Sequence, residues 1–490
     1  MKLVLAVVDG MKPAMVRRAV ETGQAPVLAK VIERGTFVPD CVAAFPSVTP
    51  VCASTIATGA RQDTHHIPAM NWFWRDERRY VEYGSSMRAA RRFGIAQQLT
   101  DLVYTMNGEH LSEGAPTIFE VLDDAGVRTA GTTFLIYRGR HEHQVSKATA
   151  LSRLAGMALR KPVMGPAELF YADVFASRDT GCRSALGKPG LRDQHAGCVG
   201  NYLFEHDLCD FLLLSLPDND THSHRFGPDS QVASIAAADR QIERMAHAAG
   251  GVDAFLDTHA LVVVADHSHT LIERRIEFEA AFRDFHVLGP SAAAFDDAEI
   301  ALCPSARSAQ IYVLVPEGRA ALVPRLVTEA LALEGVEHVL HRAGEEGVLR
   351  GADGGELRFA AGGELRDARG ARWSVEGDLS VLNARVEDGL LITPEHPDAL
   401  GRCWAALECP TSGDVFLSAA PGFEFPDWGG VDHAGGGSHG SLHHSDSLGA
   451  LLFSGIEAPP RQAWGIQDVA PMCTSAFGLD WPGCATPDGR

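Results

Sequence analysis

The sequence has few basic residues and no long hydrophobic run. Lys and Arg together number 43 against 63 Asp and Glu, which gives a formal net charge of −20. This balance argues against a nucleic-acid polymer or an anionic membrane surface as a partner, because both are bound by clustered basic side chains. It does not argue against small phosphorylated or phosphonate substrates, because bound metal ions can reverse the charge locally. No apolar stretch approaches the ~18 residues that span a bilayer.

Paired cysteine motifs are also absent from the sequence, and its first residues do not indicate a secretory leader. The ten cysteines are scattered and include no CxxC pair, a pattern typical of buried or free thiols, although a single structural disulfide stays open. The opening segment MKLVLAVVDG reaches an aspartate at position 9, whereas a secretory apolar region runs longer. We therefore expect a cytoplasmic location. The sequence does not indicate an oligomeric state.

Four continuous apolar runs predict strands that are buried on both faces. They are Leu3–Val8, Asp210–Leu216, the run within His259–His269 and Leu448–Gly455. Helical patterns such as Ser234–Gly251 lie between them. This alternation predicts an α/β fold, an alkaline-phosphatase-like sandwich with a mostly parallel central sheet flanked by helices.

Residues 271–399 differ from the rest in composition. They contain a predicted helix, LVPRLVTEALALEG, and then short alternating runs rich in glycine and charge, which are typical of hairpins. We expect a smaller α+β insertion, or cap lobe, at the mouth of the site. Residues 1–270 and 400–490 would then form the catalytic domain.

Acids and histidines follow the predicted strands, where the functional groups of parallel sheets gather. Carboxylate and imidazole groups are the usual ligands of zinc in open, catalytic sites. Two metal ions about 4 Å apart can clamp the attacking and leaving oxygens of a phosphoryl displacement. The candidate ligands are Asp9, Asp220, His224, Asp266, His267 and His439.

A hydroxyl-rich stretch without charge, FPSVTPVCASTIATG, supplies candidate nucleophiles. A hydroxyl side chain needs a base or a metal to act as a nucleophile. Thr49 is the candidate, with Ser47, Ser54 and Thr55 as alternatives in the same stretch. A helix beginning near Pro50 would direct its first backbone amides toward a phosphate.

Taken together, these motifs resemble the alkaline phosphatase superfamily and, within it, the type I phosphodiesterase/nucleotide pyrophosphatase family, which includes phosphonoacetate hydrolase. The match runs almost end to end through VVDG, FPSVT with STIATG, DTHSHRFGP, ADH, GSHGS and IQDVAP. The resemblance implies two divalent metal ions, in this family zinc. One would take Asp220, His224 and His439, and the other would take Asp9, Thr49, Asp266 and His267. It also implies that Thr49 is a metal-bound nucleophile that forms a covalent phospho-threonine.

Some positions differ from the family pattern. Asn71 falls close to the family asparagine that bonds a phosphate oxygen, one residue further from Thr49 than the family spacing. Pro50 stands where nucleotide-cleaving members carry an aromatic residue that stacks on the base, and Cys52 stands where they carry an asparagine. The resemblance therefore supports the family's core chemistry for this sequence more strongly than it supports a nucleotide substrate.

Neighbouring residues offer alternatives at several positions. Asp218 and His222 have the same spacing as Asp220 and His224, although the following Gly-Pro favours the second pair. Near His439, the alternatives are His433, His443 and His444. The aromatic residues Trp72, Phe73 and Trp74 fit the substrate pocket and the hydrophobic core equally well.

The sequence thus predicts a dizinc phosphoester hydrolase of the EC 3.1 type, most similar to phosphodiesterases and nucleotide pyrophosphatases. One alternative is a phosphonoacetate-hydrolase-like enzyme that cleaves a C–P bond. That chemistry needs cations for the substrate carboxylate, for which Arg138 and Arg140 are candidates. A second alternative is a catalytically weak, metal-stabilised binding protein, which the complete ligand set argues against.

Overall fold

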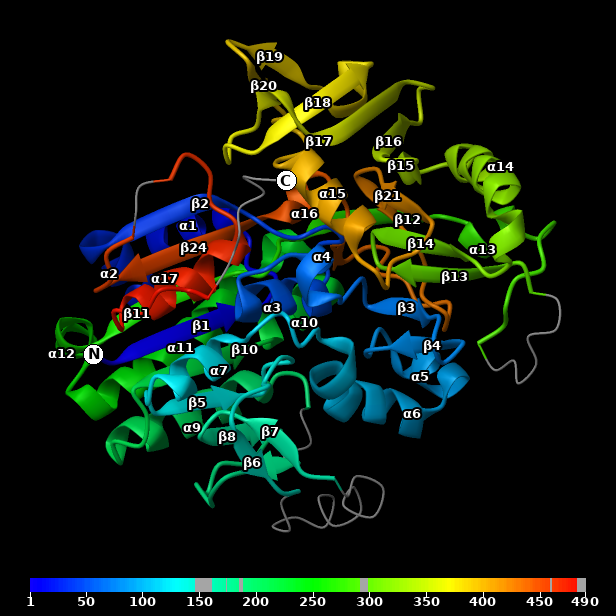
Figure 1. Cartoon of the computed structure of the whole chain (residues 1–490). Coiled ribbons are helices and arrows are strands. Elements are labelled where there is room, and N and C mark those ends of the chain that lie inside the picture. Colours follow the sequence, from blue (N-terminus) through cyan, green and yellow to red (C-terminus); the bar gives the residue numbers. More distant parts are fainter. Residues whose placement is uncertain (146–160, 173, 185–187, 291–297, 459–460, 483–490) are drawn as a thin grey trace.

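The chain forms an α/β body and a second, strand-rich lobe (Figure 1). The computed structural model describes residues 1–145, 161–172, 174–184, 188–290, 298–458 and 461–482. Within these residues, an eight-stranded sheet runs through the body. Its strands, in spatial order, are β2 (Thr36–Val42), β24 (Leu448–Ser454), β11 (Ala260–Val264), β1 (Leu3–Val8), β10 (Phe211–Leu216), β5 (Thr129–Thr132), β8 (Glu168–Tyr171) and β9 (Phe175–Ala176).

The centre of this sheet is parallel. β1 pairs in parallel with β10 on one side and with β11 on the other, and β10 pairs in parallel with β5. The last strand, β24, lies antiparallel between β11 and β2. All residues of β1, β10 and β11 are buried, as expected for strands covered on both faces. The predicted α/β class with a mostly parallel sheet is confirmed.

Helices cover both faces of the body sheet, and side chains that alternate along each strand divide between two hydrophobic clusters. Leu3, Leu5 and Val7 face one cluster, whereas Val4, Ala6 and Val8 face the other. The first cluster is covered by α3 (Thr49–Thr58), α7 (Ile118–Asp124) and α17 (Val469–Ser475). The second is covered by α1 (Pro13–Glu21), α2 (Pro26–Arg34), α9 (Arg192–Glu205), α11 (Val232–Ala246) and α12 (Val252–Thr258).

A nine-stranded sheet forms the second lobe, whose yellow strands stand at the top of Figure 1. In order, it contains β13 (Ile300–Ser305), β14 (Ser308–Val313), β21 (Val415–Ala419), β15 (Val336–Ala343), β16 (Glu346–Gly351), β17 (Glu356–Arg366), β20 (Leu390–Ile392) and β19 (Arg385–Glu387), with β18 (Arg372–Gly377) paired to β17. Two helices belong to this part of the chain, α14 (Arg319–Leu331) and α15 (Ala399–Glu408). Because β21 pairs with β14 and β15, the lobe sheet includes residues beyond 399.

Smaller sheets and helices accompany the two large sheets. A three-stranded sheet joins β12 (Thr270–Arg275) to β22 (Gly422–Glu424) and β23 (Gly437–Ser438). Two-stranded sheets pair β3 (Asn71–Trp74) with β4 (Arg79–Glu82), and β6 (His141–His143) with β7 (Val163–Gly165). Within the described ranges, the remaining α-helices are α4 (Gln62–His65), α5 (Met87–Phe93), α6 (Ile95–Thr100), α10 (Asp218–Phe226), α13 (Phe278–Ala281) and α16 (His444–Ser447), and Asp101–His110 forms a π-helix.

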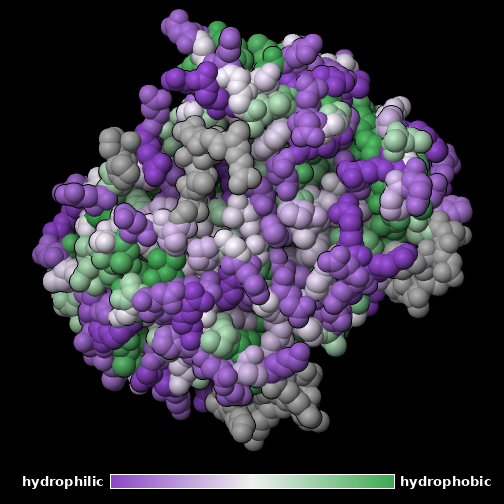
Figure 2. All heavy atoms as spheres, in the orientation of Figure 1, coloured by the Kyte–Doolittle hydropathy of each residue, from purple (hydrophilic) through white to green (hydrophobic). Residues whose placement is uncertain are grey.

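The face of the molecule seen in Figure 2 is mostly hydrophilic, and its hydrophobic residues occur in separate groups. Of the helices in the described ranges, none combines the length and the apolar character needed to span a bilayer. One disulfide joins Cys182 to Cys198. The other cysteines with described positions are free and buried, so the expected pattern of buried thiols holds alongside the structural disulfide that the sequence left open.

Candidate active site

The three predicted acids lie at one edge of the body sheet. Asp9 directly follows β1, and Asp266 follows β11 after one intervening residue, Ala265. Asp220 lies in the first turn of α10, which follows β10. Because β10, β1 and β11 are adjacent and parallel, their carboxyl ends meet at the same edge.

Asp220 is the centre of the first half of the site. Its Oδ1 lies 3.3 Å from His224 Nε2, 3.0 Å from His269 Nε2 and 3.5 Å from His439 Nε2. One ligand atom from each of these four residues lies within 4.8 Å of the others. A carboxylate and three imidazoles at such distances are a donor set suited to zinc.

His267 is the centre of the second half. Its Nε2 lies 3.5 Å from Asp9 Oδ1, 3.4 Å from Asp266 Oδ2 and 3.3 Å from Thr49 Oγ1. Asp9, Asp220 and His267 also offer ligand atoms within 4.8 Å of one another, which joins the two halves. We call the acids and histidines of both halves the pocket cluster: Asp9, Asp220, His224, Asp266, His267, His269 and His439.

The charges of the pocket cluster fit a cation. Burial, together with the negative charges of Asp266 and Asp220, raises the pKa of Asp9 well above its usual value. Asp9 Oδ1 is buried and has no hydrogen-bond partner in the structure. Burial also acts to raise the pKa of Asp220. The charges and hydrogen bonds of His224 and His269 outweigh it and hold the pKa of Asp220 well below its usual range. Buried acids this close together repel one another, and a divalent ion would offset the repulsion.

Burial also favours the neutral form of two imidazoles. It lowers the pKa of His269 to about 4 and that of His439 well below its usual value, with a further contribution at His439 from the neighbouring His267 and His269. Neutral imidazole is the form that binds a metal. The donor chemistry of the cluster therefore fits metal ions.

Thr49 is the first residue of α3. Among the contacts described, its hydroxyl is the one hydroxyl of the FPSVTPVCASTIATG stretch that contacts the pocket cluster. The alternative hydroxyls bond elsewhere. Ser54 donates to the carbonyl of Pro50 at 2.7 Å, and Thr55 donates to the carbonyl of Val51 at 3.0 Å. Cys52 is fully buried in the core, as expected for a packing residue.

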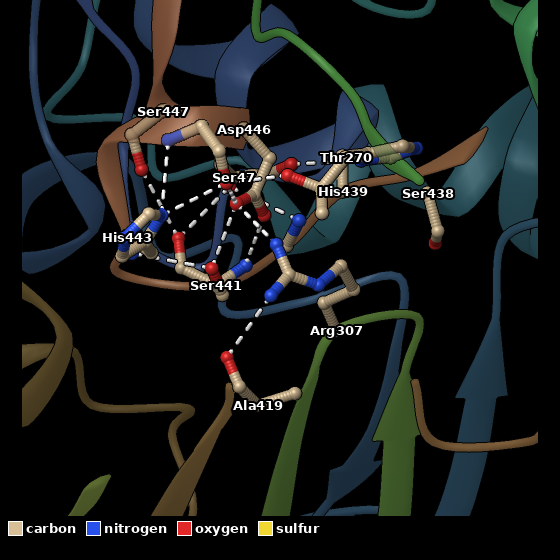
Figure 3. Close-up of polar contacts among 12 residues, drawn as sticks. Ser47, Thr270, Arg307, Ala419, Ser438, His439, Ser441, His443, Asp446 and Ser447 are labelled. Carbon is tan, nitrogen blue, oxygen red and sulfur yellow. Dashed lines mark hydrogen bonds and ion pairs between the residues drawn. The ribbon is translucent and has the colours of Figure 1, made fainter. Parts of the chain in front are cut away.

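Ser47 holds the loop that carries His439 (Figure 3). Its carbonyl accepts a hydrogen bond from His439 Nδ1 at 2.8 Å, and its hydroxyl accepts one from the amide of Gly440 at 3.1 Å. The first bond leaves His439 Nε2 free to face Asp220. Metal-binding histidines commonly donate their second nitrogen to a backbone carbonyl in this way.

A fully buried ion pair between Arg307 and Asp446 supports the same loop, and Arg307 lies below Asp446 in Figure 3. The guanidinium of Arg307 contacts Asp446 and donates to the carbonyl of Ala419 at 3.1 Å. Asp446 also accepts hydrogen bonds from the amide and the hydroxyl of Ser441 at 2.7 and 2.8 Å. The backbone amide of Arg307 donates to the carbonyl of His439 at 2.8 Å. The position of His439 thus depends on the β13–β14 turn of the lobe.

The sequence reasoning missed His269. It lies two residues after His267 and directly before β12, which pairs with β23 just before His439. Alternation along an extended chain places residues i and i+2 on one face, and this signal could have identified it. Gly10 makes room for the ring: its φ is +66°, and a Cβ there would lie 2.5 Å from His269 Nε2.

The alternative ligands have other partners. Asp218 pairs with Arg192 at 2.9 Å, and His222 contacts the carbonyl of Ser230 at 3.2 Å. His433 contacts Glu424 at 2.8 Å and stacks on His224 with ring centroids 3.9 Å apart. His443 and His444 belong to a separate group with Glu395.

A pocket of about 250 Å³ opens beside the cluster. It is lined by Thr49, Asp220, His224, His433 and His439, among others. Its lining also includes Met70, next to Asn71. Asn71 itself is buried, and its Oδ1 has no hydrogen-bond partner in the structure. No described contact joins Asn71 to Thr49, so its predicted role as a phosphate ligand stays a prediction.

The aromatic and arginine candidates pack elsewhere. Trp72 and Phe73 are buried in the core, and Trp72 and Trp74 both contact His110 edge-on. Arg138 bonds Glu120 and the carbonyls of Leu111, Ser112 and Ala115, and Arg140 pairs with Glu120 and Asp124. None of these five side chains is among the residues that line the described pocket.

Comparison with known proteins gives a family and a fold. A sequence profile described as type I phosphodiesterase / nucleotide pyrophosphatase matches residues 3–344. Human ectonucleotide pyrophosphatase/phosphodiesterase 5 is similar in structure, with a TM-score of 0.57 and 13% identity, over 99% of this chain and 96% of that one. Phosphonoacetate hydrolase from Sinorhizobium meliloti in complex with phosphonoformate has a TM-score of 0.57 and 17% identity, over 97% and 96%. No curated protein sequence matches significantly.

Proposed function

Because the chain belongs to the type I phosphodiesterase / nucleotide pyrophosphatase family, we propose that it is a dizinc phosphoester hydrolase whose nucleophile is Thr49. One observation carries the proposal. The hydroxyl of Thr49 lies 3.3 Å from His267 Nε2, in a cluster of buried acids and histidines that lines a pocket. A hydroxyl among potential metal ligands is the arrangement that this chemistry requires.

The donor set fits two ions. Asp220, His224 and His439 would hold one zinc ion, with His269 as a further donor beside Asp220. Asp9, Asp266, His267 and Thr49 would hold the other. When bound, the ions would supply positive charge that lowers the pKa of the threonine hydroxyl and offsets negative charge at phosphorus.

In the proposed reaction, Thr49 Oγ1 gives up its proton to solvent water and attacks phosphorus in line with the leaving oxygen. The new Oγ1–P bond forms as the bond from phosphorus to the leaving group breaks, and the leaving oxygen takes up a proton. A water molecule then attacks the phospho-threonine and releases the phosphate product and the free hydroxyl. Two in-line displacements retain the configuration at phosphorus.

The start of α3 adds to the binding of phosphate. Thr49 and Pro50 begin this ten-residue helix, so its first free backbone amides and the positive end of its dipole lie at the nucleophile. We propose Asn71 as a further phosphate ligand, on the resemblance and on its buried, unbonded Oδ1.

We propose small phosphorylated molecules as the substrate class. Pro50 stands where nucleotide-cleaving relatives carry an aromatic residue that stacks on the base, and Cys52 stands where they carry an asparagine, so a nucleotide is not favoured over other esters. The phosphonate alternative needs a cation for a carboxylate. Arg138 and Arg140, the residues predicted for that role, are paired elsewhere, so the C–P reaction is not favoured.

The domain division is also a proposal. We assign residues 1–270 and 400–490 to catalysis and 271–399 to a lobe that governs substrate choice. Ala306, in the β13–β14 turn, is a lobe residue that lines the pocket. Exchange of this lobe for that of a relative should change the substrate profile while leaving metal content unchanged.

A substrate panel tests the proposed function. Zinc-loaded protein is assayed with chromogenic phosphomonoester, phosphodiester and phosphonate substrates. Thr49→Ala should abolish turnover and keep both ions, because the other ligands remain. Thr49→Ser should keep part of the activity. The matched control, Thr55→Ala on the same helix, should retain turnover. Wild-type turnover in Thr49→Ala would refute the assignment, and bound zinc without turnover of any substrate would support the binding-protein alternative.

The predicted cytoplasmic location stays a prediction. The disulfide between Cys182 and Cys198 bears on it, because reducing compartments disfavour such bonds. Thiol alkylation in intact cells followed by mass spectrometry would decide the redox state of this pair. Reduced thiols would support a cytoplasmic location, and an oxidised pair would contradict it.

A further inference from the structure

A second group of histidines and an acid lies in the lobe. Glu337 and His338 are neighbours in β15, and His396 lies in the loop after β20. One ligand atom from each lies within 4.8 Å of the others. We call these three residues the lobe cluster. None of them lines the pocket beside Thr49.

A bulge brings the two neighbouring side chains of β15 together. Consecutive residues of a regular strand point to opposite faces of the sheet. The register between β15 and β21 shifts here: Val336 pairs with Ala419 and His338 with Ser418, so Glu337 is the extra residue. Such a bulge re-aims a side chain, and here Glu337 Oε2 comes to lie 3.7 Å from His338 Nδ1.

Hydrogen bonds fix which nitrogen of each ring faces the carboxylate. His338 Nε2 lies 2.6 Å from the carbonyl of Val381, and His396 Nδ1 lies 3.3 Å from the carbonyl of Leu382. A carbonyl only accepts, so each of these nitrogens carries the proton. The opposite nitrogens, His338 Nδ1 and His396 Nε2, therefore present lone pairs when the rings are neutral.

Both lone pairs are directed at a carboxylate in a buried place. His396 Nε2 lies 3.4 Å from Glu337 Oε1. His338 and His396 are 3% and 1% exposed, and His338 Nδ1, His396 Nε2 and Glu337 Oε2 have no hydrogen-bond partner in the structure. Three buried acceptors facing one another repel unless a proton or a metal ion lies between them.

We propose that Glu337, His338 and His396 form a further zinc-binding site, separate from the pocket cluster. Two imidazoles and a carboxylate are a known zinc donor set. Metal-binding histidines are usually oriented by a hydrogen bond from the second ring N–H to a backbone carbonyl. The side chain of Glu337 is 24% exposed, which leaves a path for the ion and for a water ligand.

The site would fasten the lobe to the loop that leads from His439. The amide of His444 donates to the carbonyl of Glu395, next to His396, at 2.8 Å. His443 Nε2 lies 3.4 Å from Glu395 Oε2, and the rings of His396 and His443 are 5.7 Å apart. An ion held by His396 would thus restrain the segment that follows the pocket ligand His439.

Zinc stoichiometry of the full chain tests the proposal. Chelator-stripped protein is dialysed against zinc, and bound metal is measured by mass spectrometry for the wild type, Glu337→Gln and His396→Gln. The matched control is His341→Gln, a half-buried histidine of the same strand that contacts the carbonyl of Arg342. Each lobe-cluster variant should bind one zinc ion fewer per chain than the wild type and the control. Because the result is a difference, it is independent of zinc in the pocket and of any activity.

Thermal unfolding of the same samples separates metal loss from misfolding. Zinc should raise the melting temperature of a folded lobe-cluster variant less than that of the wild type. If His396→Gln does not fold, Glu337→Gln decides alone, since it keeps the shape of the side chain. Wild-type zinc content in a folded lobe-cluster variant would overturn the proposal. Equal loss in the His341→Gln control would overturn it too.

Discussion

The pocket cluster and the lobe cluster contain the same kinds of side chain but arise in different ways. In the pocket, Asp9, Asp220 and Asp266 come together because three parallel strands end at one edge. In the lobe, Glu337 and His338 come together because one strand is locally irregular. The first arrangement is a property of the topology, and the second is a property of a single bulge.

The two clusters also differ in what they can reach. Asp220, His224 and His439 line a pocket of about 250 Å³, with a candidate nucleophile beside them. The histidines of the lobe cluster are almost fully buried, and no hydroxyl is among the three residues. A site open to substrate suits catalysis, whereas a closed one suits the joining of two segments.

The largest effect should come from Asp220, the acid that contacts three histidines of the pocket cluster. Asp220→Asn keeps the shape but removes the charge that draws an ion to His224, His269 and His439. We expect loss of pocket zinc and a fall in turnover of roughly a thousandfold, because the charge stabilisation supplied by a metal is worth several kcal/mol. Zinc in the lobe cluster should remain. Loss of zinc from both clusters would show that they are not independent.

A large effect on stability should come from Asp446. Asp446→Ala leaves Arg307 fully buried without its ion-pair partner, beside the loop that carries His439. Breaking a buried pair in this way costs about 3–5 kcal/mol, which urea unfolding would measure. The double variant Asp446→Leu with Arg307→Met should recover part of the loss. A single variant as stable as the wild type would contradict the role of this pair.

A moderate effect should come from His269. His269→Met removes one nitrogen from Asp220 while filling similar space, and we expect zinc binding at the pocket to weaken by about 10–100-fold. Competition with a zinc indicator would measure it. His222→Gln, in the neighbouring helix α10 but bonded to Ser230, is the control. Unchanged affinity in His269→Met would leave His269 as a packing residue and make the pocket set the one predicted from the sequence.

The smallest effect should come from a hydroxyl outside both clusters. Ser54→Ala removes one buried hydrogen bond to the carbonyl of Pro50. We expect a loss of about 1 kcal/mol in unfolding free energy and wild-type turnover. This variant sets the baseline for the other three. A large fall in turnover would mean that helix α3 transmits small packing changes to Thr49.

The sequence predicted the parts of the molecule that depend on order along the chain. Buried runs ending in Asp9 and Asp266 predicted parallel strands with acids at one edge, and this arrangement is present. The motif DTHSHRFGP paired Asp220 with His224, and in the structure the two lie one turn apart on α10, 3.3 Å from each other.

The parts that the sequence did not predict depend on local geometry or on long-range packing. His269 follows His267 by two residues, but only the pairing of β12 with β23 brings it to Asp220. The side chains of adjacent residues such as Glu337 and His338 should point to opposite faces of a regular strand. The sequence around them does not indicate a bulge. The environment of Trp72 and Phe73 depends on packing against His110 and Tyr312, which are distant in sequence.

The position of β24 has a consequence for synthesis of the protein. This strand, residues 448–454, lies between β2 and β11, so the sheet stays split until the ribosome has made these residues, long after both neighbouring strands. Until then, β2 and β11 each expose an unpaired edge, the kind of surface that promotes aggregation. His439 arrives just before β24, so the site is completed at the same late stage. A nascent chain can therefore neither close its sheet nor complete its active site early, and truncated products would be exposed to quality control rather than partly active.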